Sequence, residues 1–157
     1  MPKIIAKLLL ILAISTCAVF GADSSLGTWK LNVEKSKYTP APLPFKSITV
    51  VREASDGGVK VTVTGDRADG TAVNYSYTGK YDGTPSTVTG TGSPYDTTST
   101  KRVNATTFTS ERKKTGGSYH ATVRTVVSKD GKTMTQTATG TGTDGKPSTS
   151  TLVLEKQ

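Results

Sequence analysis

Few residues in this chain of 157 could carry catalysis: it has one histidine, His120, and one cysteine, Cys17. Cys17 lies in an apolar N-terminal segment, and a Ser–His–Asp triad would depend on His120 alone. No serine lies in the nucleophile-elbow sequence that many such triads use. The sequence therefore predicts a protein that is not an enzyme and has no catalytic residues.

Metal and phosphate sites are not indicated either. The sequence has no cluster of His and Cys ligands, and Asp66 and Asp69 lie where turns favour acidic residues. Gly90-Thr91-Gly92 and Gly140-Thr141-Gly142 lack the strand-to-helix context of a phosphate loop. We therefore expect no bound metal ion and no cofactor.

The N-terminus has the pattern of a secretory signal. Two lysines precede the apolar residues 8–14, and small residues follow as far as Ala22. This apolar run is shorter than the roughly 20 residues of a membrane-spanning helix. We expect residues 1–22 to be a signal peptide and residues 23–157 to be one domain in the periplasm or outside the cell. Lipid attachment at Cys17 is an alternative, although the threonine before it fits a lipobox poorly.

The chain is basic, with a formal net charge of +8 and a pI of about 9.6. Its lysines and arginines are dispersed, and no block of five or six like charges is present. This distribution does not indicate a nucleic-acid partner, and we expect no stable membrane insertion. We expect a monomer with a soluble basic surface.

Asp-Gly pairs divide the sequence into short segments of alternating polarity. Asp and Gly tolerate the backbone of tight β-turns, and alternation of period two is typical of strands with one buried face. The pattern predicts roughly eight to ten strands, and the candidate segments are residues 26–31, 46–54, 59–65, 71–79, 86–91, 98–103, 105–113, 118–128, 132–140 and 148–155.

A meander of this many strands would leave two long exposed edges unless it closed on itself. We therefore predict an all-β fold, a single antiparallel up-and-down β-barrel of roughly eight to ten strands. Residues 32–45 contain three prolines, which cannot donate ladder hydrogen bonds, so they are expected to form a long loop.

Three motifs carry a resemblance to a known superfamily. Gly27-Thr28-Trp29 resembles the Gly-x-Trp signature of lipocalins and fatty-acid-binding proteins, and residues 130–136 and 151–156 resemble the last hairpins of the fatty-acid-binding barrels. The leader, the proline-rich segment and the Val-Ser-Lys-Asp-Gly-Lys-Thr-Met run at 127–134 are similar to exported bacterial lipocalin-like proteins. The resemblance implies a barrel with a small-molecule cavity, one end of which is plugged by Trp29.

The family's carboxylate-binding Arg-x-Tyr has no match here, because Arg124 is followed by Thr125 and Val126. The arginine that secreted lipocalins carry near the final strand is also absent, and Lys156 is the only remote substitute.

Candidate ligand contacts come from alternating strand positions. The predicted site comprises Tyr75, Tyr77, Phe108, His120, Val123 and Arg124. Other possible polar anchors are Arg102, Arg112 and Tyr119. The simplest assignment places Val123 inside and Arg124 in solvent, whereas the opposite face would give a cationic site for an acidic ligand.

The predicted function is binding of a small hydrophobic or amphipathic molecule by an exported protein. The alternative is a filled barrel that acts as an envelope structural or interaction protein through its basic, threonine-rich surface.

Overall fold

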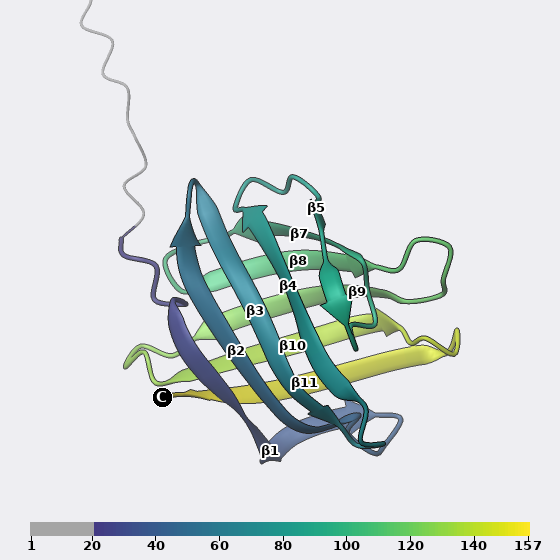
Figure 1. Ribbon diagram of the computed structural model, residues 1–157. Coiled ribbons are helices and arrows are strands. Elements are labelled where there is room, and N and C mark those ends of the chain that lie inside the picture. Colours follow the sequence, from purple (N-terminus) through teal and green to yellow (C-terminus); the bar gives the residue numbers. More distant parts are fainter. Residues whose placement is uncertain (1–20) are drawn as a thin grey trace, which may run out of the picture.

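The computed structural model describes residues 21–157, which form eleven strands (Figure 1). None of these residues forms a helix, so no membrane-spanning helix is found among them. The predicted leader and Cys17 lie outside the described residues, except for the leader's last two positions. The strands are β1 (Gly27–Thr39), β2 (Phe45–Ser55), β3 (Gly58–Arg67), β4 (Ala72–Lys80), β5 (Ser86–Thr87), β6 (Thr89–Thr91), β7 (Thr97–Arg102), β8 (Thr107–Lys113), β9 (His120–Val127), β10 (Thr133–Thr141) and β11 (Pro147–Lys156).

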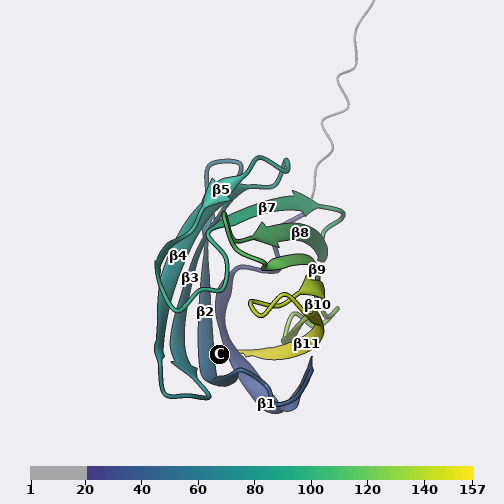
Figure 2. The ribbon, with the colours of Figure 1, turned by 90° about the vertical axis from the view of Figure 1, so that its right-hand side faces the viewer.

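All the strands belong to one antiparallel sheet of order β5-β7-β8-β9-β10-β11-β1-β2-β3-β4-β6. Pairing of β1 with β11, in which Trp29 lies opposite Lys156, joins the first and last strands. Figure 2 shows β2, β3 and β4 on one side of the barrel and β7 to β11 on the other. The predicted all-β, single antiparallel barrel is confirmed, with eleven strands instead of eight to ten.

The barrel is nearly closed between β4 and β7 by one short segment. Within residues 86–91, β5 pairs with β7 and β6 pairs with β4. Val88, between the two, is buried, and its N–H donates to the Asp96 carbonyl at 2.8 Å. The single strand predicted for these residues is therefore divided into two short strands, and each of them pairs with a different edge of the sheet.

The loop predicted for residues 32–45 is shorter than expected. β1 continues to Thr39 and pairs with β11 again from Lys37 onward. The prolines follow the last paired residue, so their missing N–H groups remove no hydrogen bond from this ladder. Only residues 40–44 connect β1 to β2.

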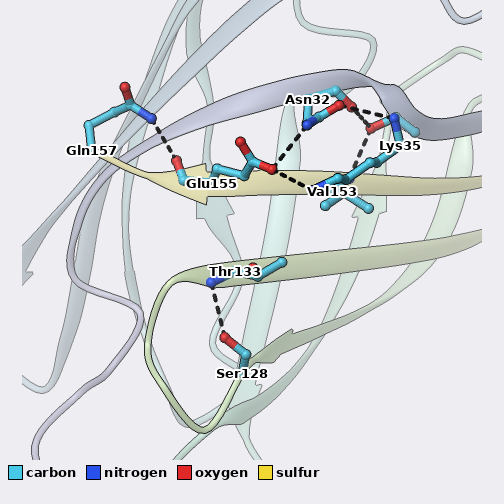
Figure 3. Close-up of polar contacts among 8 residues, drawn as sticks. Asn32, Lys35, Ser128, Thr133, Val153, Glu155 and Gln157 are labelled. Carbon is cyan, nitrogen blue, oxygen red and sulfur yellow. Dashed lines mark hydrogen bonds and ion pairs between the residues drawn. The ribbon is translucent and has the colours of Figure 1, made fainter.

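A bulge lets β1 continue past the point where its register with β11 shifts. The Ser36 hydroxyl donates to the Asn32 carbonyl at 2.6 Å and accepts from the Val153 N–H at 3.0 Å. Lys35 Nζ and Asn32 Nδ2 also donate to Glu155 Oε1 (Figure 3). The Lys35–Glu155 ion pair is exposed and contributes little stability, so the Ser36 bridge is the more important link across the bulge.

Trp29 is fully buried at one end of the barrel, which we call the base. Its indole Nε1–H donates to the Ser25 carbonyl at 2.9 Å, and Lys156 Nζ lies 5.1 Å from the ring centroid. Met134 and Leu154 are also fully or almost fully buried in the same core. Because its ring is enclosed and its one donor is satisfied, Trp29 has a packing role here.

A polar network surrounds Asp23 at the base. Asp23 Oδ1 accepts from the Ser25 N–H at 2.9 Å and the Ser25 hydroxyl at 2.6 Å, and Oδ2 accepts from the Tyr81 hydroxyl. Arg52 Nε donates to the Ser25 hydroxyl oxygen at 3.2 Å. Burial alone would raise the pKa of Asp23, but these hydrogen bonds and the Arg52 charge together lower it.

We predict that Asp23→Asn destabilises the protein by about 1 kcal/mol at pH 6, since it removes charge-assisted hydrogen bonds. A lowered folded-state pKa stabilises the fold above the unfolded pKa, and this contribution is lost as the pH falls through the folded pKa. The difference in unfolding free energy between wild type and variant should therefore shrink below about pH 4. Urea unfolding at a series of pH values measures it.

Asp56→Asn, at an exposed position in the turn between β2 and β3, is the matched control for loss of one carboxylate. A difference for Asp23→Asn that is the same at pH 3 and pH 6 would contradict the assignment of the effect to the Asp23 charge.

Candidate functional site

A cavity of about 130 Å³ lies inside the barrel. Much of its wall is apolar and comes from strands on both sides of the β1–β11 junction: Leu31, Ile48, Val50, Val61, Val63 and Leu154. The cavity is also lined by Pro44 and by the exposed Thr143, which lie in connections at the end opposite the base. It therefore reaches the surface at that end, which we call the mouth.

Four tyrosines, the tyrosine cluster, line one part of this cavity: Tyr75, Tyr77, Tyr95 and Tyr119. Tyr95 packs edge-on against Tyr75 at 5.8 Å between ring centroids and stacks on Tyr119 at 5.9 Å. The hydroxyls of Tyr75 and Tyr95 lie 3.4 Å apart. Burial raises the pKa of Tyr75, Tyr95 and Tyr119, so these phenols are neutral near pH 7 and keep hydroxyl protons to donate.

Arg112, from β8, brings a positive charge to the tyrosine cluster. Its Cζ lies 4.9 Å from the Tyr95 ring centroid, within range of a cation–π interaction. Burial lowers the pKa of Arg112, but the charges that Tyr95, Tyr77, Tyr119 and Tyr75 acquire when they ionise raise it by more. Since a guanidinium titrates far above neutral pH, Arg112 is charged at pH 7.

No carboxylate within residues 21–157 forms an ion pair with Arg112, and its buried Nε has no hydrogen-bond partner there. The buried hydroxyl of Thr98 is also without a partner. Thr98 lies directly opposite Arg112 across the β7–β8 ladder. In the described part of the chain, these are the two buried side-chain polar atoms without hydrogen-bond partners. Both belong to one cross-strand pair on the cavity side of the sheet. Buried polar groups are nearly always satisfied, so this pair requires an explanation.

Arg52 and Arg67 also line the cavity, but each has other contacts. Arg52 donates to Ser25 at the base, where its charge helps to lower the pKa of Asp23. Arg67 donates to the Gly92 carbonyl at 3.3 Å and lies over the Phe45 ring at 5.6 Å. The Thr71 hydrogen bonds are the main cause of the lowered pKa of Asp69, and the Arg67 charge adds to it.

The structure brings three of the six predicted site residues to the cavity: Tyr75, Tyr77 and Val123. Phe108 is buried but does not line the cavity. It lies instead toward the base, with its ring centroid 5.0 Å from that of Tyr81 and 5.8 Å from Arg52 Cζ.

His120 and Arg124 are exposed on the outer face of β9 and do not line the cavity. The structure thus follows the simplest assignment, with Val123 inside and Arg124 in solvent, and the alternative of a cationic cavity formed by His120 and Arg124 is wrong. Successive strand residues point to opposite faces, and Ala121, Val123 and Thr125 take the inner positions. His120 Nε2 lies 3.2 Å from Glu111 Oε2, with both side chains more than half exposed.

Sequence reasoning missed Tyr95 and did not separate Arg112 from the other arginines. Tyr95 lies between strands, where alternation gives no information about orientation. The one available signal for Arg112 was its spacing from Phe108. Residues 108, 110 and 112 share a strand face, and Phe108 is the large apolar residue of that strand.

Comparison of the chain with protein-family models and with curated proteins finds no match. The chemistry of the site itself consists of an apolar cavity, four phenols and a guanidinium that has no counter-charge among residues 21–157. Among residues 21–157, no group of three or more His, Cys, Asp or Glu side chains is placed to hold a metal ion.

We predict that Arg112→Met stabilises the ligand-free protein by about 1 kcal/mol. Methionine has a similar length and no charge, so the substitution removes a partly buried cation that has no counter-charge among residues 21–157, at the cost of one cation–π contact. Urea unfolding of protein that has been denatured, dialysed and refolded provides the measurement.

Arg124→Met is the matched control, because Arg124 is exposed on the neighbouring strand. It should change the unfolding free energy by less than about 0.5 kcal/mol. A loss of stability in Arg112→Met larger than that in Arg124→Met would show that the Arg112 charge is already satisfied in the folded chain.

Proposed function

We propose that this protein is an exported, lipocalin-like binder of a small amphipathic molecule, which it holds in the barrel cavity without chemical change. The observation that carries this proposal is the cavity's two-sided lining. Valines, leucines and isoleucine offer an apolar surface, while the tyrosine cluster and Arg112 offer polar groups on the other side. Small-molecule sites in proteins combine apolar walls with a few orienting polar groups in this way.

The size of the cavity limits the ligand. A volume of about 130 Å³ is close to that of engineered protein cavities of about 150 Å³ that accept benzene. A ligand of about one ring fits inside, and a longer one would extend through the mouth.

The surroundings of His120 support a non-catalytic role. Its imidazole pairs with Glu111 on the outer surface, on the opposite face of the sheet from the cavity. In the described residues it is therefore not available as a base for any group in the cavity. The cavity groups themselves are suited to holding a ligand by hydrogen bonds and charge.

Native mass spectrometry tests the binding proposal. Purified protein is exposed to a bacterial lipid and metabolite extract without detergent, and we expect a discrete added mass that disappears on denaturation. Val123→Phe should abolish this mass, because it fills the cavity from β9. Circular dichroism checks that the variant still folds.

Val126→Phe is the matched control, since Val126 lies on the same strand but points outward. It should leave the added mass in place. Only the bare polypeptide mass with every extract, for wild type and both variants, would contradict the proposal and favour a role for the outer surface.

Export is tested separately. Expression of residues 1–157 in a bacterial host should give a periplasmic or extracellular protein. Its measured mass should equal that of residues 23–157, which begin at Asp23. A protein that retains residues 1–22, or that begins at a lipidated Cys17, would contradict the expected cleavage.

A further inference from the structure

The charges that line the cavity are of one sign. Its only ionisable side chains other than tyrosine are Arg52, Arg67 and Arg112, and no Asp or Glu of the described residues lines it. Two of the three cations have other electrostatic neighbours: Asp23 for Arg52 and Asp69 for Arg67. One positive charge, that of Arg112, has no counter-ion among residues 21–157.

We propose that Arg112 and the tyrosine cluster bind the carboxylate of a small aromatic acid. This inference rests on the proposed function, because it names the ligand class of the same cavity. The planar guanidinium matches a carboxylate with two parallel hydrogen bonds, which are stronger when both partners are charged.

The neighbouring phenols fit the same ligand. Tyr75 and Tyr95 share one weak contact of 3.4 Å between their hydroxyls, which leaves donor capacity for a carboxylate oxygen. The rings of Tyr95 and Tyr119 are already stacked, so an aromatic ligand ring could pack against the edge of this stack.

The single unpaired charge favours a monoanion. A phosphate monoester carries about −1.5 to −2 charges at pH 7, and a second free cation would be needed to balance it. Arg52 and Arg67 do not meet this need, since each already has hydrogen bonds and a nearby carboxylate. A carboxylate brings one charge, and the cavity volume leaves room for about one ring beside it.

Benzoate is the probe for this proposal, and benzamide is its neutral counterpart of nearly the same shape. Isothermal titration calorimetry and thermal shifts should show benzoate binding wild type at least tenfold more tightly than benzamide. Benzoate binding should weaken as the pH falls below about 4, where carboxylic acids are protonated.

Arg112→Met should lose at least tenfold in benzoate affinity, while its affinity for the neutral probe toluene stays within about twofold. Arg112→Lys keeps the charge but not the two-pronged geometry, so it should recover only part of the loss. Arg124→Met, on the outer face, should bind benzoate like wild type.

The outcomes separate this inference from the proposed function. If toluene and benzamide bind in the cavity as tightly as benzoate, or if Arg112→Met binds benzoate like wild type, the carboxylate site is overturned and the cavity binder stands. Tighter binding of phenyl phosphate than of benzoate would also overturn the carboxylate assignment. If no probe binds wild type, the carboxylate site is overturned, and native mass spectrometry with the extracts decides the proposed function separately.

Discussion

The pairing of β1 with β11 is the constraint on which the rest of the structure depends. Without it, the sheet would have two long free edges, and its concave face would be open to solvent. With it, the first and last strands become neighbours, and the strand order runs continuously from β7 through β11 and β1 to β4. The bulge at Asn32–Lys37 belongs to the same pairing, because β1 pairs with β11 on both sides of this register shift.

Once the barrel is rolled up, alternation along each strand decides which residues face the interior. The inner positions of β2 and β3 are mainly apolar, with Ile48, Val50, Val61 and Val63. The inner positions of β7 and β8 are largely polar and include Thr98, Thr100, Ser110 and Arg112. Thr100 and Ser110 satisfy one another at 2.9 Å, whereas Thr98 and Arg112 do not. The interior is therefore two-sided, and its polar side is only partly satisfied.

The sequence was sufficient for the fold because its turns and alternation are explicit. All five glycines of the Asp-Gly pairs have positive φ, such as 66° at Gly57, which is the conformation that tight turns require. Two details could not be predicted in this way. Proline content suggested a loop from residue 32, although the proline-free residues up to Thr39 can still pair, and residues 86–91 gave no sign that they would divide between two edges.

The site was harder to predict because each strand has two possible faces. A shift of one residue exchanges the inner and outer sets, so Arg112 and Arg124, on adjacent strands, were equivalent candidates until the register was known. The register places Arg112 opposite the inward Ala121 and Arg124 opposite the outward Thr109, so the two arginines face opposite sides of one sheet.

Because the two arginines face opposite sides of the sheet, their charges differ in free-energy cost. On the outer face, Arg124 is solvated, and its charge needs no partner. At the cavity, Arg112 is partly buried and has exchanged some of its water for aromatic rings, and a cation–π contact offsets only part of the cost of this burial. The small valine side chains opposite add a second cost, because the space they leave is not filled by the protein. A folded chain that has both an unfilled volume and an unmatched charge in the same place is less stable than one with a filled, neutral core, and an anion with an apolar body would relieve both costs at once.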